Sequence, residues 1–218
     1  MFGEIFANRR EAGLELAAAL ESLRGQDVVV LAIPRGGVEV AAAVADALQA
    51  PLDVVIPRKI GAPGNPELGL GAVAEGVEVL DERLIRMLGV DQAYLRAEIA
   101  AQQEETARRS AAYRRGRQPV DVEGKVALVV DDGVATGGTA AAAVRWARRK
   151  GAARVVLAIP VAPRDAVHRL EAEADQVVAL ATPEPFFAVG QWYTDFPQVS
   201  DDQVVGLLSE RAGGEGGA

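Results

Sequence analysis

The sequence predicts an α/β fold in which a mostly parallel sheet is flanked by helices. Short runs of β-branched apolar residues, typical of strands buried on both faces, alternate along the chain with segments of helical periodicity. Strands and helices that alternate in this way form parallel sheets with right-handed crossovers. The 218 residues, half of them apolar and a quarter charged, are enough for one large globular domain and exclude extended disorder.

The composition narrows the possible functions. The chain carries 23 Lys and Arg against 31 Asp and Glu, and this net charge of −8 disfavours general binding to nucleic acid or to an anionic membrane. The absence of cysteine excludes disulfides, thiolate metal sites and a cysteine nucleophile, and the single His168 cannot form a histidine-rich metal centre. No apolar stretch approaches the ~18 residues of a membrane span, and the N-terminus does not resemble a signal peptide. We therefore expect a cytoplasmic protein without a membrane or nucleic-acid partner.

The first half of the chain begins with a capped helix. Asn8 and Glu11 stand at the spacing of a capping box, and the apolar residues after them recur with helical period until the helix ends near Gly25. A continuous apolar run then predicts a buried strand. We expect this strand at 27–33, a helix at 38–48 and a second strand at 52–56.

The next segment interrupts the alternation of strands and helices. It is rich in glycine and proline, and short apolar patches on either side of Glu75 and Gly76 predict a hairpin. We expect a flexible arm over about 58–80. Two helices should follow at 81–88 and 91–113, each with an aspartate at its N-cap.

The second half of the chain returns to the alternating pattern. We expect strands at 126–130, 154–159 and 176–180, and helices at 139–150 and 163–174. Residues 183–198 hold most of the aromatic side chains, and a capped helix at 201–211 follows them. The predicted organisation is a core over 1–182, a hood with a C-terminal helix over 183–211, and a disordered tail at 212–218.

One segment, residues 126–139, combines features of a phosphorylated-sugar site. Its hydrophobic strand ends in Asp131 and Asp132, and a loop of small residues leads into a helix. Gly137 and Gly138 allow close approach of the backbone, and the helix N-terminus offers unpaired amides to a phosphate. The two carboxylates repel phosphate, so their expected partners are sugar hydroxyls or a hydrated divalent cation.

This segment resembles the phosphoribosyl pyrophosphate (PRPP) motif of the type I phosphoribosyltransferases, with its hydrophobic strand, two acidic residues and small Thr/Gly loop. It matches neither a dinucleotide-binding nor a Walker pattern. The resemblance implies a Mg²⁺-dependent, homodimeric enzyme whose sheet is ordered about 3-2-1-4-5, with the first strand beside the diacidic strand. It implies that Asp131 and Asp132 bind the ribose hydroxyls and the metal. The 5′-phosphate is then held by Ala135, Thr136, Gly137, Gly138 and Thr139.

A second site matches the family in position. The segment after the first strand is where the family keeps a pyrophosphate loop, whose amides are often exposed by a non-proline cis bond. Here that loop supplies Arg35, Gly36 and Gly37. The guanidinium of Arg35 offers a fork of donors suited to a diphosphate.

A third site follows the second strand. Arg58 and Lys59 stand where family members place a basic residue against the pyrophosphate, and the arm corresponds to the family's flexible loop, which closes over the site. Glu67 or Glu75 in this arm is a candidate carboxylate near the acceptor. The catalytic residues that the resemblance implies are Arg35, Lys59, Asp131 and Asp132.

The sequence predicts the acceptor substrate of the phosphoribosyl group less narrowly. The small residue Ala135 stands where 6-oxopurine members carry an aspartate, and the loop is closer to that of adenine-type members. The hood aromatics either stack on a flat heterocycle or pack the hood against the sheet. These aromatics are Phe186, Phe187, Trp192 and Tyr193.

The resemblance implies transfer of the 5-phosphoribosyl group of PRPP to a nitrogen acceptor, expected to be a nucleobase in nucleotide salvage, with release of pyrophosphate. The alternative is a non-catalytic regulatory protein that binds PRPP or a nucleotide in the same pocket. We expect Trp146 in the core and His168 in solvent. The arginines of one further cluster are expected on a solvated or subunit-interface face. They are Arg108, Arg109, Arg114, Arg115 and Arg117.

Overall fold

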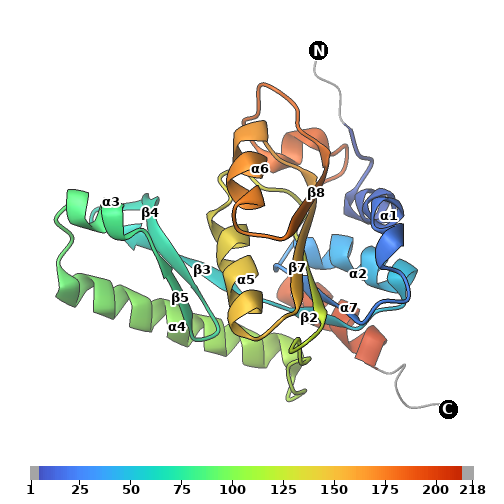
Figure 1. The fold of residues 1–218 in the computed structure, drawn as a ribbon, viewed down its shortest axis with the longest axis horizontal. Coiled ribbons are helices and arrows are strands. Elements are labelled where there is room, and N and C mark those ends of the chain that lie inside the picture. Colours follow the sequence, from blue (N-terminus) through green and yellow to red (C-terminus); the bar gives the residue numbers. More distant parts are fainter. Residues whose placement is uncertain (1–4, 213–218) are drawn as a thin grey trace.

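A computed structural model describes residues 5–212, apart from the side chains of Glu67 and Ala212 (Figure 1). Residues 213–218 of the predicted disordered tail lie outside this range, and Ala212 is the last residue of α7 (Asp201–Ala212). The predicted α/β fold is confirmed. In the described range, no helix is both long and apolar enough to cross a membrane.

Five parallel strands form the central sheet, in the order β2-β1-β6-β7-β8. They are β1 (Val28–Ala32), β2 (Leu52–Val54), β6 (Val126–Val130), β7 (Arg154–Val161) and β8 (Gln176–Ala181). The first strand and the diacidic strand are neighbours, as predicted, and their paired residues run from Val28 and Val126 to Ala32 and Val130. The two strands therefore end level, and the loops that follow them leave the sheet side by side.

The order differs from the predicted 3-2-1-4-5 at one edge. The strands that follow β2 pair with one another in a second, three-stranded sheet, so β2 has no outer neighbour among the described strands and forms the edge of the central sheet. The difference arises because these arm strands are antiparallel and close locally through hairpins, which requires no partner in the central sheet.

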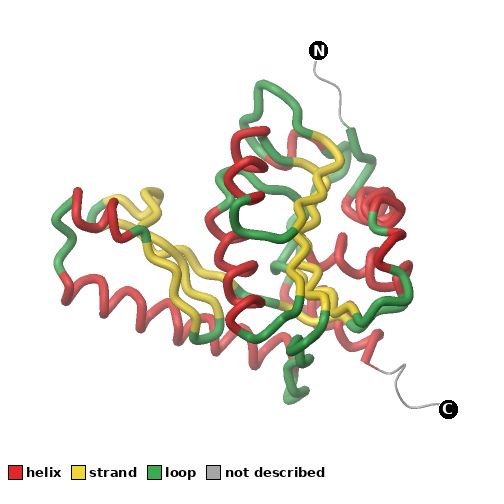
Figure 2. Tube along the Cα trace, in the orientation of Figure 1, coloured by secondary structure: helices red, strands yellow, loops and turns green. Residues whose placement is uncertain are grey.

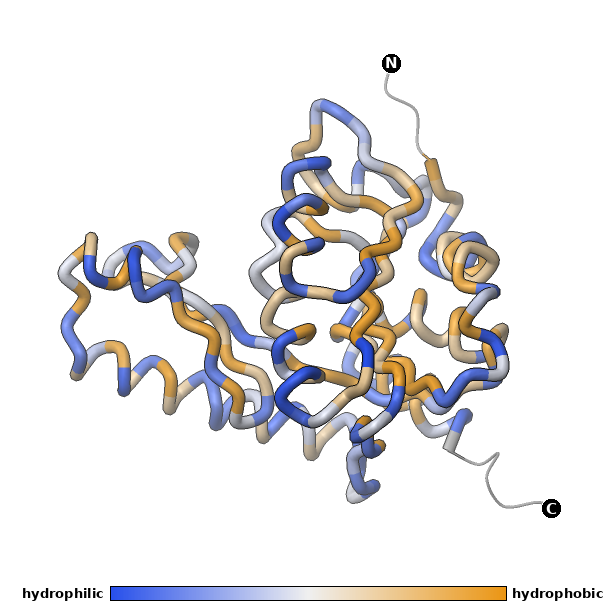
Figure 3. The backbone as a smooth tube through the Cα atoms, in the orientation of Figure 1, coloured by the Kyte–Doolittle hydropathy of each residue, from blue (hydrophilic) through white to orange (hydrophobic). Residues whose placement is uncertain are grey.

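Helices cover both faces of the central sheet (Figure 2). Alternate strand residues such as Val30 and Leu128 face α1 (Arg9–Ala19), α2 (Gly37–Leu48) and α7. The residues between them, such as Leu31 and Val129, face α5 (Gly138–Arg149) and α6 (Arg164–Glu171). Hydrophobic segments accordingly concentrate in the central strands, drawn orange in Figure 3. Trp146 lies in the second of these layers and His168 is exposed, as predicted.

The arm projects from one side of the core (Figure 1). It consists of β3 (Pro57–Ala62), β4 (Asn65–Ala74), β5 (Val77–Leu80), α3 (Glu82–Met87) and the long α4 (Gln92–Arg114). The predicted hairpin turn is present, because Glu75 and Gly76 both take positive φ, of 39° and 82°, between paired Ala74 and Val77. The predicted helix caps are confirmed in Asp81 and Asp91, whose carboxylates accept from backbone amides 2.9 and 3.2 Å away.

The hood lies against the N-terminal segment. The amides of Ile5 and Phe6 both donate to the carbonyl of Trp192 at 3.0 Å, and the amide of Asp195 donates to Ala7 O at 2.9 Å. Phe6, Trp192 and Tyr193 are buried in one aromatic cluster beneath this contact. Segments from the two ends of the chain are therefore joined at the carboxyl edge of the central sheet.

Candidate functional site

The loops that follow β1 and β6 touch one another at the carboxyl edge of the sheet. A Cβ atom added at Gly36 would lie 1.9 Å from Asp132 Oδ2, and one added at Gly37 would lie 2.9 Å from Asp131 Cα. Only glycine allows this approach. The Pro34–Arg35 peptide bond is cis and not an X-Pro bond, as the resemblance implied.

Asp132 is held in place from two sides. Arg9 Nε donates to Asp132 Oδ2 at 2.7 Å, and the hydroxyl of Tyr193 donates to the Asp132 carbonyl at 2.5 Å. The Arg9 side chain is 6% exposed, also donates to Pro197 O at 2.7 Å, and lies 3.7 Å above the ring of Phe196. Asp132 is therefore fixed by the first helix and by the hood.

Asp131 is less constrained by its neighbours. Its Oδ1 accepts from the amide of Asp132 at 2.9 Å. Burial raises the pKa of the Asp131 carboxyl well above its usual range, and the charge of Asp132 raises it further, whereas Arg9 acts in the opposite direction. The ionised form of Asp131 thus gains from a bound cation or from hydroxyl groups that donate to it.

The 135–139 loop has the geometry of an anion cradle. The amide of Val134 donates to Val161 O at 3.0 Å and ties the start of the loop to β7. Gly137 takes the left-handed conformation, with φ of 89°, just before α5 begins. Gly138 and Thr139 open α5, and the first amides of a helix have no acceptor within that helix, so they can donate to a bound anion. Thr136, Gly138 and Thr139 are exposed.

A cavity of about 570 Å³ lies between this loop and the arm. Lys59 lines it from β3, together with Gly69 and Gly71 of β4, and Thr136 and Thr139 line it from the other side. The structure therefore brings Lys59 to the 135–139 loop, although the two are far apart in the printed sequence.

Two other predicted basic residues have different surroundings. Arg58 precedes Lys59 on β3 but turns away from the cavity, because its Nε donates to Gln102 Oε1 on α4 at 3.0 Å. Arg35 lies at the 34–37 loop with its side chain 44% exposed, and its Nη1 is 3.9 Å from Asp201 Oδ1. Arg35 thus stays available at the loop, whereas Arg58 supports the arm.

The hood aromatics divide into two groups. Trp192 and Tyr193 are buried, with 2% and 3% exposure, and the Phe186 ring centroid lies 6.0 Å from that of Trp192. These three favour the packing alternative. Phe187, by contrast, is 81% exposed, so it remains the hood aromatic with a free face.

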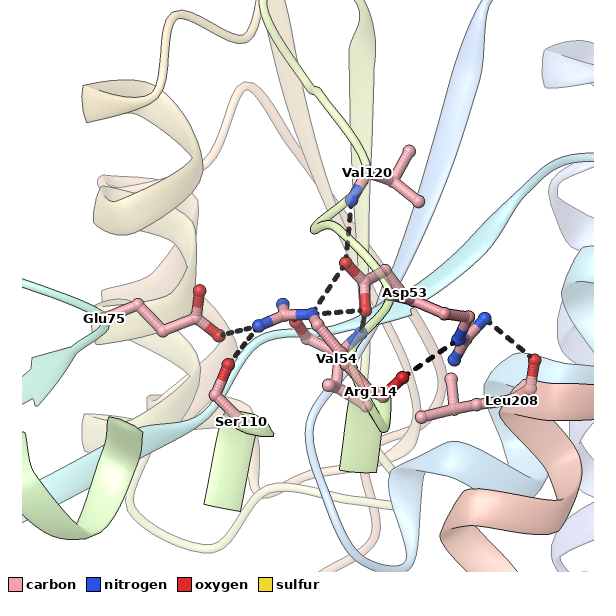
Figure 4. A network of polar contacts seen from close by, with 8 residues as sticks. Asp53, Val54, Glu75, Ser110, Arg114, Val120 and Leu208 are labelled. Atoms are coloured by element: carbon pink, nitrogen blue, oxygen red, sulfur yellow. Dashed lines mark hydrogen bonds and ion pairs between the residues drawn. The ribbon is translucent and has the colours of Figure 1, made fainter. Parts of the chain in front are cut away.

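Two expectations about charged side chains were wrong. Arg114 does not lie on a solvated face, because its side chain is only 4% exposed and pairs with Asp53 and Glu75 (Figure 4). Arg117 is partly buried as well, and its Nη1 donates to Leu208 O at 3.1 Å. Glu75 is consequently engaged at the junction of arm and core rather than at an acceptor. The side chain of Glu67, the other candidate, lies outside the described residues.

Sequence reasoning also missed Arg9. The spacing of the sequence could have indicated that Arg9 is buried. Arg9 precedes Ala12 and Leu16 by three and seven residues, which places it on the buried face of α1. A charged residue on such a face needs a buried partner. Nothing local identifies that partner as Asp132, which lies 123 residues away.

The carboxylate oxygens at the site suit a cation that arrives together with the substrate. In the part of the chain that the structure describes, no three His, Asp or Glu side chains gather into a ready metal site. Mg²⁺ commonly binds through one or two carboxylates together with waters and substrate phosphates. The adjacent carboxylates of Asp131 and Asp132, beside an anion cradle, fit that mode of binding.

Comparisons with known proteins agree with this geometry. Residues 4–191 match the model of the phosphoribosyl transferase domain. Over 206 residues, 94% of the chain, the sequence is 50% identical to proteins from two strains of Mycobacterium tuberculosis that are provisionally named phosphoribosyl transferases. The chain spans about half the length of these curated relatives, 46%. The crystal structure of the protein TT1426 from Thermus thermophilus superposes with a TM-score of 0.84 and 48% identity, covering 95% of this chain and 99% of that one.

Proposed function

Because this chain belongs to the phosphoribosyl transferase family, we propose that it transfers the 5-phosphoribosyl group of PRPP to a nitrogen acceptor and releases pyrophosphate. The observation that carries the proposal is the contact between the two loops at the ends of β1 and β6, where Gly36 meets Asp132. Ligands of open α/β sheets bind at such loop pairs. A ligand with a phosphate at each end and a sugar between them fits this arrangement.

Each part of PRPP has a proposed partner. The 5′-phosphate binds the amides and hydroxyls of the 135–139 loop. Lys59, which the resemblance placed against the pyrophosphate, lines the same cavity as this loop and adds positive charge there instead. The ribose hydroxyls donate to Asp131, whose ionised form they stabilise. The diphosphate lies at the 34–37 loop beside Arg35.

The chain's own residues act mainly through charge and position. The bond between ribose C1′ and the diphosphate oxygen breaks as the acceptor nitrogen bonds to C1′. The bonding electrons leave with the diphosphate, and the proton of an N–H acceptor is released to solvent. Arg35 and the loop amides stabilise the negative charge that builds on the leaving group, and Asp131 favours the positive charge on the ribose. Asp131 and Asp132 would hold a Mg²⁺ ion that arrives with the substrate, and that ion would supply further positive charge near the leaving group.

The acceptor is proposed to be a nucleobase. Phe187 supports this, because an exposed aromatic ring in the hood offers a stacking surface for a flat heterocycle. The methyl side chain of Ala135 supplies no group that could read the base.

The test is Mg²⁺-dependent pyrophosphate release from PRPP across purine and pyrimidine bases, orotate, nicotinate and simple amines. Asp131→Asn serves as the inactive variant, and Asp27→Asn, an exposed aspartate before β1, is the matched control. Release with one acceptor that is lost only in Asp131→Asn supports the enzyme. PRPP binding without release under any acceptor would instead support the non-catalytic regulatory protein.

A further inference from the structure

We propose that Arg169 of α6 is a positioning residue for the 135–139 loop, which orients the amide of Gly137 toward the 5′-phosphate of the ligand and adds a positive charge beside it. The inference rests on the proposed function, since that function assigns the 5′-phosphate to this loop. Arg169 lies outside the 126–139 segment, so the pattern of that segment does not identify it.

The first argument is the pair of contacts that the Arg169 guanidinium makes. Its Nη2 donates to the carbonyl oxygen of Thr136 at 3.4 Å, and its Nη1 donates to Asp165 Oδ2 at 2.8 Å. The bond from Arg169 lowers the pKa of the Asp165 carboxyl, so this carboxylate stays ionised at neutral pH and holds the guanidinium. The contact with Thr136 is the longer of the two, and the tether to Asp165 therefore decides where the guanidinium lies.

The second argument is the geometry of the peptide bond between Thr136 and Gly137. Over residues 5–212 the cis peptide bonds are Pro34–Arg35 and Glu184–Pro185, so the bond before Gly137 is trans. The carbonyl oxygen and the amide hydrogen of a planar trans peptide point in opposite directions. Because the Thr136 carbonyl is turned toward Arg169, the N–H of Gly137 points to the side of the loop that faces away from α6.

The third argument is that α6 itself is packed against the loop. Leu170 is 2% exposed, and a Cβ atom added at Gly137 would lie 3.5 Å from its Cδ1 and Cγ atoms. Ala166, on the same face of α6, is fully buried. The bond from the Val134 amide to Val161 O ties the start of the loop to the strand that leads into α6. α6 therefore closes one side of the loop and leaves the other side, to which the Gly137 amide points, for a ligand.

The fourth argument is where the positive charge of Arg169 comes from. A phosphate monoester carries about 1.5 to 2 negative charges near neutral pH, so more than one cation can act on it. Lys59, which lines the cavity at this loop, belongs to the arm, whereas Arg169 belongs to the core. Because Arg169 is tethered within α6, its charge stays at the loop whatever the position of the arm.

The pair formed by Arg169 and Asp165 also has a simpler explanation. The two residues stand four apart on α6, and an arginine in the last turn of a helix interacts favourably with the helix dipole. A pair with only this role would stabilise α6 slightly and would have no effect on ligand binding. A positioning role, by contrast, predicts a change in the affinity for ligands that carry a 5′-phosphate.

Calorimetric titration of the full chain with ribose 5-phosphate and with inorganic diphosphate, each with Mg²⁺, tests the proposal. Arg169 is 58% exposed, so Arg169→Gln should fold. We expect this variant to raise the Kd for ribose 5-phosphate about fivefold and the Kd for diphosphate by less than about twofold. Arg149→Gln, an exposed arginine at the far end of α5, is the matched control and should change neither constant. Unchanged binding of ribose 5-phosphate to Arg169→Gln, or equal losses for both ligands, would overturn the proposal.

Asp165→Asn separates the position of the Arg169 guanidinium from its charge. If Arg169 acted only as a nearby charge, removal of the negative Asp165 would tighten the binding of ribose 5-phosphate. A positioning role predicts the opposite, a Kd raised about threefold, because the guanidinium loses its tether. Arg169→Lys returns the charge without the planar fork and should recover only part of the affinity. Tighter binding to Asp165→Asn, or full recovery in Arg169→Lys, would contradict the positioning role.

The same titrations separate this inference from the proposed function. A wild-type protein that binds neither PRPP nor ribose 5-phosphate would overturn the proposed function and the role of Arg169 with it. A wild-type protein that binds both ligands, together with an Arg169→Gln variant that binds them equally well, would overturn the role of Arg169 alone.

Discussion

The carboxyl edge of the central sheet and the arm each depend on one buried arginine, but the two arginines have different tasks. Arg9 pairs with Asp132, a carboxylate that belongs to the candidate site. Arg114 pairs with Asp53 and Glu75, which lie at the junction of arm and core. The edge presents its groups from loops, whereas the arm presents Lys59 from within a strand. The difference is that Arg9 fixes a carboxylate of the site by direct contact, whereas Arg114 acts at the junction from which the arm projects.

Breaking the buried ion pair between Arg114 and Asp53 should have the largest effect on stability. Asp53→Asn breaks the buried ion pair and leaves Glu75 as the remaining carboxylate partner of Arg114, so we expect the free energy of unfolding to fall by about 3 kcal/mol. Denaturant titration measures this loss. A loss below about 1 kcal/mol would show that the network does not carry the junction.

The largest effect on activity should come from a substitution at the carboxyl edge of the central sheet. Asp131→Asn is expected to lower kcat/KM for pyrophosphate release by on the order of 100-fold, since a charge that stabilises the transition state is lost. The stability of the folded protein should not decrease in this variant. The pKa of Asp131 is raised in the folded state, so its contribution to stability is present at low pH and is lost as the pH rises, and the neutral asparagine avoids this loss. Unchanged kcat/KM would contradict the assigned role.

Arg9 should affect activity through Asp132. Arg9→Gln removes the donor that fixes the carboxylate, and we expect kcat/KM to fall by about tenfold, with partial recovery in Arg9→Lys because the positive charge returns. Steady-state kinetics at saturating acceptor measure both variants. If Arg9→Gln lowers only the melting temperature and leaves kcat/KM of the folded protein unchanged, Arg9 does not act on activity through Asp132.

The smallest effect is expected where α4 meets α7. Tyr113 OH donates to Asp201 Oδ1 at 2.7 Å, and burial together with this bond raises the pKa of Tyr113 to about 12. The stabilisation is therefore present below pH ~10 and is lost as the pH rises through about 12. Tyr113→Phe should lose about 1 kcal/mol at pH ~8 and decline less steeply than the wild type between pH ~10 and ~12. Parallel curves for the two proteins in that range would refute the assignment.

Local features of the chain were predicted well from the sequence. The Asn8 cap accepts from the amide of Glu11 at 2.9 Å, and the hairpin at Glu75 and Gly76 forms where the apolar patches placed it. The loop from Asp131 to Thr139 also has the expected strand, turn and helix. Each of these depends on residues close together in the chain, so spacing alone carries the information.

The long-range charge pairs were not predictable in the same way. Arg114 stands in a run of arginines that looks uniformly solvated, and its partner Asp53 lies 61 residues earlier. The glycines of the arm were similarly ambiguous. Gly71 contributed to the expectation of a flexible arm, but a Cβ atom there would lie 2.1 Å from Val79 O, so this glycine permits close strand packing. Composition does not distinguish a glycine that gives mobility from one that allows contact.

The central claim is that the 34–37 and 135–139 loops form one site for a single ligand. Calorimetric titration with PRPP, ribose 5-phosphate and inorganic diphosphate, each with Mg²⁺, tests it in wild type and in Gly36→Ala, where the new methyl group meets Asp132. PRPP should bind more tightly than either ribose 5-phosphate or inorganic diphosphate. Gly36→Ala should lose binding of diphosphate and PRPP while it keeps binding of ribose 5-phosphate. PRPP that binds no more tightly than ribose 5-phosphate, or binds Gly36→Ala equally well, would contradict the claim.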